Sequence, residues 1–397
     1  MDTPRQEHSD LQESDPVYAT EAPGGRRYCL YRYADVSAAF KDKRFGAAPA
    51  PPHLLRALRC VGLSALANAV ESGFLVSLNP PDHTRLRKVI EPFFLVRAIP
   101  AWKPRVETIV EDLLAPMGKS QQFDFIADFA APLPTRVIAE MFGFPEQDVA
   151  PLKRWSDEMA ALVDSDLQRS AFPRRLAAFL KFRRRVLQLV KERSQHPRDD
   201  LLSALANAYL VRGELTKDEV VGTAVFVLTA GHATTTHLIG SCLLILLKNP
   251  GVAARLREDP DLIDRVVEET LRLESTIQRT GRVLLEDVEI HGLRLPKGTK
   301  IRLMIGDANR DPLRFEHPGQ FDIARHDKRH LGFGSGIHQC IGLHLARLEA
   351  RIAISVKRHP ILTSYRRPKM TPLWAWVAGP IRCSHHTAQP YRASGVR

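Results

Sequence analysis

Apolar residues recur along most of the chain at the three- and four-residue spacing of amphipathic helices. This helical pattern extends from His83 to about Val190 and is interrupted mainly at prolines. A capping box at 216–219, Thr-Lys-Asp-Glu, predicts the start of a long helix from about Lys217 to Lys248. Because this segment is apolar nearly all round, we expect it to be buried. Helix is predicted again from about Val252 to Glu274.

Beyond residue 280 the pattern changes to short apolar segments separated by glycine and proline, which is typical of strands and turns. A last amphipathic helix is expected from Leu343 to Lys357, with a hairpin in the tail at 374–380. We predict one α+β fold that is predominantly α-helical, with small β-sheets and a long central helix. Residues 1–25 are expected to form a flexible polar leader, and residues 26–397 a single domain. The predicted strands lie at 28–33, 282–284, 288–290 and 301–305.

The sequence contains no run of about 18–20 uninterrupted apolar residues, so no membrane span is predicted. Its N-terminal segment lacks the apolar core of a signal peptide, and we therefore expect a cytoplasmic protein. The formal net charge of +12 would suit nucleic acid, an acidic membrane surface or an acidic protein partner. Because the basic residues are scattered and no DNA-binding motif accompanies them, we expect no nucleic-acid partner.

The cysteines are odd in number, far apart in the sequence and without a Cys-x-x-Cys pair, which argues against a disulfide framework or a structural zinc site. One of them, Cys340, follows Gly334 and Gly336 and precedes Gly342 and a predicted helix. Glycines let the backbone turn tightly and approach a flat ligand, and a helix N-terminus stabilises a thiolate. The simpler interpretation is a glycine-rich turn beside a buried cysteine. The five cysteines are Cys29, Cys60, Cys242, Cys340 and Cys383.

The segment from Phe333 to Gly342, Phe-Gly-Ser-Gly-Ile-His-Gln-Cys-Ile-Gly, resembles the Phe-Gly-x-Gly-x-His-x-Cys-x-Gly signature of the cytochrome P-450 family. The resemblance covers nearly the whole chain and is closest to the soluble bacterial branch. It implies one haem-binding domain that holds haem b, with Cys340 as the axial ligand of the iron. It also implies that Phe333 packs near the sulfur and that His338 contacts a haem propionate, while Gly334 and Gly342 shape the haem loop.

A further family feature is a buried ion-pair network, formed by a Glu-x-x-Arg pair on one helix and an arginine that precedes the haem loop. Glu269 and Arg272 have this spacing, and Arg325 matches the third position. Taken alone, such a pair is a common contact on a solvated helix face. With the resemblance, we assign the three residues to the fold rather than to the chemistry.

Haem carries two carboxylates, which buried cations can bind. His83 and Arg87 follow Pro-Pro-Asp and lie four residues apart, so they share one helical face. Without the resemblance they would be an exposed polar face. The resemblance implies that they hold a propionate, and that Arg282 does so as well.

In the middle of the long helix, Ala230, Gly231 and Thr234 match the family motif Ala-Gly-x-acid-Thr. In the family the small residues make room for O2 over the iron, and the acid and the threonine help to deliver protons. Here the acid is replaced by Ala233, which departs from the pattern and puts the usual proton relay in doubt.

Without that carboxylate, the protons need another source. His232 lies two residues from Thr234 and should point away from it, whereas His237 lies one turn further along. We expect a water chain or a polar group of the substrate to complete the relay, rather than either histidine.

The resemblance also places substrate contacts in several separate segments. At each such position, plain core packing is an equally good interpretation of the sequence. The pocket candidates are Leu75, Val76, Ala230, Thr234, Ile277 and Trp376.

Three functions are compatible with these features. The main hypothesis is a monooxygenase that inserts one atom of O2 into a C–H bond of an apolar small molecule, for which a terpenoid or other polycyclic natural product is favoured. Electrons would come from a ferredoxin and its reductase, and the expected docking residues are Arg85, Lys88 and Arg347. The second hypothesis keeps the haem but assigns peroxide-driven oxidation, desaturation or ring formation, because of Ala233. The third is a non-catalytic haem sensor or carrier.

Overall fold

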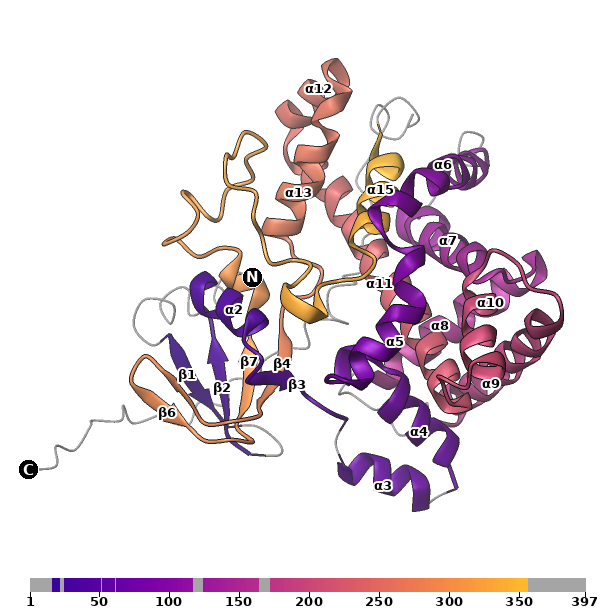
Figure 1. Ribbon diagram of the computed structural model, residues 1–397. Helices are drawn as coiled ribbons and strands as arrows, with labels where there is room; N and C mark the ends of the chain where they lie inside the picture. Colours follow the sequence, from indigo (N-terminus) through magenta and orange to yellow (C-terminus); the bar gives the residue numbers. More distant parts are fainter. Residues whose placement is uncertain are drawn as a thin grey trace, which may run out of the picture.

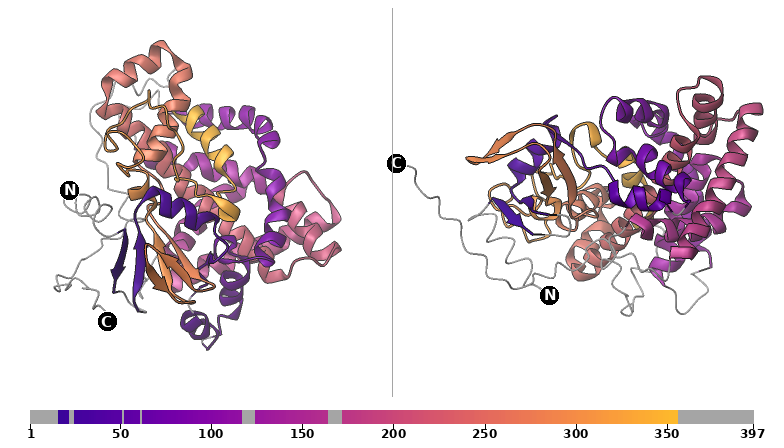
Figure 2. Two further views of the ribbon diagram at one scale, coloured as in Figure 1. Left: turned by 60° about the vertical axis from the view of Figure 1, so that its left-hand side comes forward. Right: turned by 90° about the horizontal axis from the view of Figure 1, so that it is seen from below.

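The computed structural model describes residues 16–21, 25–50, 52–60, 62–116, 124–163 and 172–355, except for the side chains of 160–163. Its helices surround one long central helix, and a small sheet lies to one side (Figures 1 and 2). The α-helices are α2 (Tyr33–Lys41), α3 (Pro52–Cys60), α4 (Ser64–Gly73), α5 (Asp82–Ile90), α6 (Ile99–Leu114), α7 (Pro132–Phe142), α8 (Val149–Val163), α9 (Phe172–Gln195), α10 (Leu201–Ala206), α11 (Lys217–Lys248), α12 (Pro250–Glu258), α13 (Ile263–Leu273), α14 (Ile305–Ala308) and α15 (Leu343–Ile354).

The larger sheet has the strand order β1-β2-β7-β4-β3, in which only the β2–β7 pair is parallel. A separate hairpin pairs β5 with β6. The strands are β1 (Val17–Thr20), β2 (Arg27–Leu30), β3 (Phe45–Ala47), β4 (Thr280–Leu284), β5 (Val288–Ile290), β6 (Leu293–Leu295) and β7 (Lys300–Leu303). The sheet therefore joins the beginning of the chain to the segment that follows α13, and α2 and α14 pack together beside it.

The central helix α11 has the bounds that the sequence predicts. The Thr216 hydroxyl accepts the Glu219 N–H, and the Glu219 carboxylate accepts the Thr216 N–H, which completes the capping box. Helices α4, α7, α8, α13 and α15 pack around it. By length and composition α11 could cross a membrane, but 56% of its most apolar window is buried inside the protein, as in the core helix of a globular fold.

At one crossing, α4 and α11 approach until their backbones touch. A side chain at Gly73 would collide with the backbone of Gly222, and a side chain at Gly222 would collide with the carbonyl oxygen of Ala69. The Asn68 amide also donates to the Asp218 carboxylate at 3.0 Å. The two helices are thus fixed to each other without intervening side chains.

Four sequence predictions need correction. The helix expected from Val252 to Glu274 is broken between α12 and α13, because Pro260 disfavours helical backbone at Asp259. The strand expected to continue to Tyr33 ends at Leu30, and helix α2 begins at Tyr33. The strand expected at 301–305 ends at Leu303, before α14. The leader predicted for residues 1–25 is wrong in part, because Val17–Thr20 forms strand β1 and pairs with β2. Residues 1–15 and 22–24 of this leader and the tail hairpin lie outside the described residues.

Candidate active site

A glycine-rich loop leads from Leu331 to the start of α15 and carries Cys340. Gly334 and Gly336 have φ angles of +65° and +70°, which side-chain-bearing residues rarely adopt. A side chain at Gly336 would also collide with the carbonyl oxygen of Phe40 on α2. The loop therefore turns in a shape that glycine permits, and it is seated against α2.

Cys340 is fixed within this loop by its backbone. Its N–H donates to the carbonyl of Phe333 at 2.9 Å, and α15 begins three residues later at Leu343. Burial raises the pKa of the Cys340 thiol, whereas the N–H of Gly342 and the charges of Arg87 and Arg347 lower it. These last groups favour a thiolate, which is the form that binds metals. The four cysteines within the described residues are all free.

Four nitrogen-bearing side chains from three separate segments gather beside the loop. His83 and Arg87 come from α5, Arg282 from β4 and His338 from the loop itself. The ring centroids of His83 and His338 lie 4.3 Å apart, and Arg87 donates to the carbonyls of residues 337 and 339 at 3.1 and 3.0 Å. The sequence-predicted propionate ligands are thus brought together.

This cluster is short of negative charge. Arg282 is 3% exposed and makes no ion pair within the described part of the chain, while Arg87 pairs with Glu91 at 3.0 Å. Burial lowers the pKa of Arg282 to about 10. Burial, together with the charges of His83, Arg282 and Arg87, lowers the pKa of His338 to about 3. An anionic ligand would pair with the buried charge of Arg282.

Helix α11 is buried except along one stripe. Phe226, Ala230, Thr234 and His237 all retain exposed surface and lie three or four residues apart, on one face. The Thr234 hydroxyl donates to the Ala230 carbonyl at 2.6 Å. This stripe contains the positions that the sequence predicts to lie over the iron.

The other predicted distal residues point elsewhere. A side chain at Gly231 would press on Ile138 of α7, so this glycine permits the close approach of α7. His232 is buried against α8, where its Nδ1 lies 3.3 Å from the Ser156 hydroxyl and 3.8 Å from the Asp157 carboxylate. Burial lowers the pKa of His232 to about 4, despite the raising effect of Asp157. His232 therefore faces away from Thr234, as helical geometry predicts.

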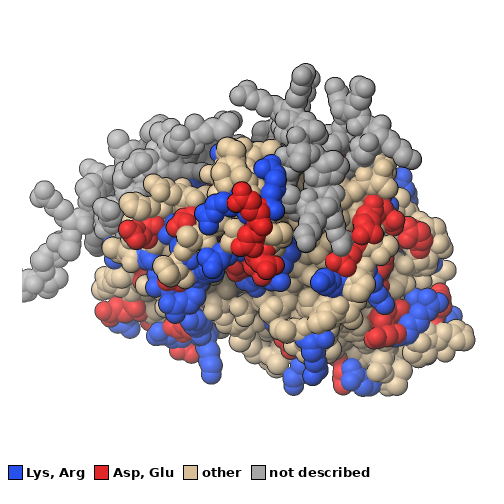
Figure 3. Space-filling model, turned by 90° about the horizontal axis from the view of Figure 1, so that it is seen from above, with Lys and Arg blue, Asp and Glu red and all other residues tan. Residues whose placement is uncertain are grey.

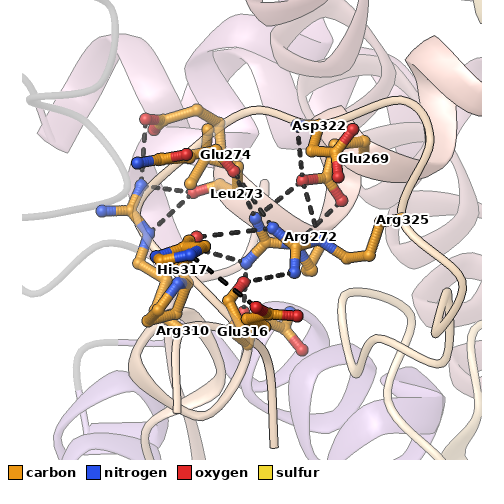
Figure 4. A network of polar contacts seen from close by, with 12 residues as sticks. Glu269, Arg272, Leu273, Glu274, Arg310, Glu316, His317, Asp322 and Arg325 are labelled. Carbon is orange, nitrogen blue, oxygen red and sulfur yellow. Dashed lines mark hydrogen bonds and ion pairs between the residues drawn. The ribbon is translucent and has the colours of Figure 1, made fainter. Parts of the chain in front are cut away.

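The Glu269, Arg272 and Arg325 side chains form one buried network (Figure 4). Arg272 donates to both Glu269 carboxylate oxygens at 2.8 Å, and Arg325 donates to Oε1 at 3.1 Å. Arg272 further donates to the backbone carbonyls of residues 309, 318 and 320. The network thereby fixes the loop that precedes the Cys340 segment onto α13.

The predicted substrate residues do not form one group. Leu75 is 4% exposed within the helical core, whereas Val76 is 45% exposed. Ile277 is partly buried against the sheet, and Trp376 lies outside the described residues. These assignments stay predictions.

The family model for cytochrome P450 matches residues 31–356. The chain belongs to the cytochrome P450 family. Among curated relatives, the biotin biosynthesis cytochrome P450 of Bacillus subtilis is 34% identical over 357 residues, which cover 89% of each chain. The 6-deoxyerythronolide B hydroxylase of Saccharopolyspora erythraea is 34% identical over 352 residues, covering 87% of this chain and 86% of the relative.

A solved structure of P450BioI, in complex with an acyl carrier protein ligated to hexadec-9Z-enoic acid, superposes with a TM-score of 0.82 at 35% identity, covering 90% of this chain and 92% of that one. The fold is thus the P450 fold, as the sequence predicts. The protein is a monooxygenase of this family, which uses haem b and O2.

The residues present fit haem. The Nε2 atoms of His83 and His338 are buried without a hydrogen-bond partner among the described residues, and propionates beside Arg282 could bond to them. Apart from its chain neighbours, no atom of the described residues lies within 4 Å of the place that a side chain would take at Gly342, so their packing does not demand glycine there. A flat ligand against the loop accounts for both features.

One residue of the site escaped the sequence analysis. Phe40 supplies the ring beneath Arg282, with 5.3 Å between the guanidinium carbon and the ring centroid, and its carbonyl supports Gly336. It lies about 240–300 residues before these partners in the sequence, and its own helix carries no motif that could have revealed the contact.

Proposed function

We propose that this protein inserts one atom of O2 into a C–H bond of an apolar small molecule, with Cys340 as the axial haem ligand. The observation that carries the proposal is the placement of Cys340, which is fixed by the Phe333 carbonyl at the start of α15 and lies beside the nitrogen-bearing side chains of His83, Arg282 and His338. When bound, a thiolate-ligated haem supplies the activation of O2, because the thiolate favours O–O cleavage.

Spectroscopy of the reduced protein under carbon monoxide tests the ligand. We expect the strongly red-shifted band of thiolate ligation in the wild type and its loss in Cys340→His. The control is Cys242→Ala, which removes a fully buried cysteine from α11 and should keep the band. If Cys340→His keeps the band, another residue is the ligand and the proposal is wrong.

Thr234 would be the hydrogen-bonding residue on the distal side. Its hydroxyl bonds the Ala230 carbonyl within the helix and, on rotation, would present its proton on the exposed side of α11. Position 233 is an alanine and His232 is directed at α8, so neither of these two residues supplies a proton to Thr234. Protons would therefore arrive through water or through a polar group of the substrate.

A second candidate function is favoured by Ala233. Oxidative bond or ring formation, desaturation and peroxide-driven oxidation make different demands on the proton relay. Two proteins with solved structures at 32% identity are named for such chemistry, the enzyme CxnD for C–S bond formation and the putative thioether synthase SgvP. Turnover under isotopically labelled O2 separates the two functions. Label in the product supports hydroxylation, whereas label in water alone supports bond formation, and turnover with peroxide alone supports a peroxide-driven enzyme.

The substrate that we favour is a polycyclic, terpenoid-like natural product. Relatives named for compounds of this kind include the vitamin D(3) 25-hydroxylase of Pseudonocardia autotrophica, 35% identical over 353 residues, which cover 88% of this chain and 84% of the relative. Binding of such compounds is tested by the change that they cause in the spin state of the haem iron. A panel in which only fatty acids cause this change would contradict the choice.

For electrons we propose a ferredoxin and its reductase, in the cytoplasm. Of the three docking residues predicted from the sequence, Arg85 pairs with Glu219 and Asp82, and Arg347 pairs with Glu268. Lys88 is exposed and remains the best candidate. On the face seen in Figure 3, basic and acidic side chains are interspersed. Lys88→Glu should slow reduction by a ferredoxin and weaken its dependence on salt, and unchanged kinetics would place docking elsewhere.

A further inference from the structure

The Phe333 ring, in the loop that carries Cys340, is held on two sides by polar side chains. The guanidinium carbon of Arg347 lies 4.7 Å over the ring centroid, a cation–π contact. The imidazole of His330 lies beside the ring, with 6.1 Å between centroids. Since the Phe333 carbonyl accepts the N–H of Cys340, movement of this residue is transmitted to the cysteine.

Both of these side chains are bound by one carboxylate, that of Glu268 on α13. Arg347 Nε and Nη2 donate to Oε1 and Oε2 at 2.6 and 2.9 Å, a bidentate contact of fixed geometry. His330 Nε2 lies 3.3 Å from Oε2. Because His330 Nδ1 accepts the N–H of Gly332 at 3.0 Å, its proton resides on Nε2 and is donated to Glu268.

The three groups also form an electrostatic unit. Burial alone would raise the pKa of Glu268, but the hydrogen bonds from His330 and Arg347 outweigh it and lower this pKa to about 2. Glu268 is therefore a carboxylate at neutral pH. It offsets the charge of Arg347, which acts on the Cys340 thiol.

We propose that Glu268 is a positioning residue for the haem–thiolate site: it holds Arg347 over Phe333 and His330 beside it, and so sets both the place of this ring against the Cys340 loop and the charge that the sulfur experiences. The inference rests on the proposed function in one respect, that Cys340 is the haem ligand. Glu268 acts only through its contacts with His330 and Arg347.

The test compares Glu268→Gln with Asp264→Asn. Asp264 and Arg351 form an ion pair at 2.6 Å between the same two helices, one turn away and more exposed, with 58% and 41% of the side chains accessible. The control therefore removes a carboxylate between α13 and α15 without touching Phe333. We expect the holoprotein of Glu268→Gln to release haem to apomyoglobin about tenfold faster than the wild type, the lower end of the effect of such supporting groups on metal affinity. Asp264→Asn should release it at the wild-type rate.

The midpoint reduction potential of the haem iron distinguishes the proposed role of Glu268, which combines positioning with charge balance, from a general loosening of the haem site. Removing the negative charge of Glu268 should raise the potential, and removing the positive charge in Arg347→Gln should lower it. Greater access of water would move both variants in the same direction. Glu268→Asp keeps the charge and should restore most of the wild-type potential.

The inference is overturned if Glu268→Gln matches Asp264→Asn in haem release and potential, or if the Glu268 and Arg347 variants shift the potential alike. Should Glu268→Gln fail to accumulate as folded protein, His330→Gln tests one arm alone and must speed haem release. These outcomes are distinct from failure of the proposed function, which appears in the carbon monoxide spectra of the wild type and Cys340→His, where Glu268 is unchanged.

Discussion

Glu269→Gln should destabilise the protein strongly while changing one atom. The Glu269 carboxylate is 6% exposed and accepts hydrogen bonds from Arg272, from Arg325 and from the backbone N–H of Asp322 at 3.1 Å (Figure 4). In glutamine an NH2 group replaces one of the two carboxylate oxygens, and this group donates hydrogen bonds but cannot accept them. It would face the donors of Arg272, which is 1% exposed.

The size of this loss of stability depends on which buried groups are left without a partner. Removing one partner of a buried ion pair typically costs about 3–5 kcal/mol, because the remaining charge stays buried without compensation. Here Arg272 keeps three backbone acceptors, and Arg325 keeps the Glu316 carbonyl at 2.6 Å. These bonds hold both arginines in place, so the loss should lie near the lower end, about 3 kcal/mol. That is a large part of the roughly 5–15 kcal/mol by which proteins are stable.

Urea unfolding, followed by tryptophan fluorescence, measures this loss. Both the apoprotein and the holoprotein should be compared, since bound haem adds stability of its own. The control is Glu274→Gln, which removes a more exposed carboxylate, 3.0 Å from Arg310, at the end of the same helix. It should cost less than about 1 kcal/mol. If Glu269→Gln lowers the free energy of unfolding of the apoprotein no more than this control does, the network of Glu269, Arg272 and Arg325 does not stabilise the fold.

Three further predictions concern the site. Gly336 has a φ of +70°, and a side chain there would collide with Phe40. Gly336→Ala should therefore displace the Cys340 loop and reduce the haem content of the purified protein. Thr234→Ala should raise the peroxide released per electron consumed, and Ala233→Asp should fold normally and hasten turnover of poor substrates. The folded-state pKa of Glu268, about 2, lies below its ordinary value, so its contribution of about 3 kcal/mol is present above pH 4.5 and lost as the pH falls toward 2.

Each has its own check. Gly292→Ala has a similar φ of +77° but open space around it, so it separates backbone strain from the collision and should leave the haem content unchanged. If Thr234→Ala releases no more peroxide per electron than the wild type while His237→Ala releases more, the proton relay runs through His237. The stability difference between the wild type and Glu268→Gln should shrink between pH 5 and pH 3 in urea titrations, and a constant difference would refute the assigned charge.

The sequence was most informative where one local pattern specifies a structure. The capping box at Thr216 determines where α11 begins, and the string around Cys340 carries its glycines at the positions that need positive φ. It was least informative for contacts between distant segments. Glu268 lies 62 residues before His330 and 79 residues before Arg347. Nothing in the sequence around this glutamate indicates either contact. The sequence could not rank the pocket candidates for the same reason, because exposure at Val76 and burial at Leu75 depend on the packed fold.

The backbone contact between α4 and α11 has a consequence for how this enzyme can diversify. Since neither Gly73 nor Gly222 admits a side chain, substitutions at this crossing will be eliminated before selection for a new substrate can act on them. Variation in α4 is therefore confined to positions away from this crossing and outside its other buried residues. A mutant library of this enzyme should leave the crossing fixed, because each variant lost at the crossing is lost to folding rather than to catalysis.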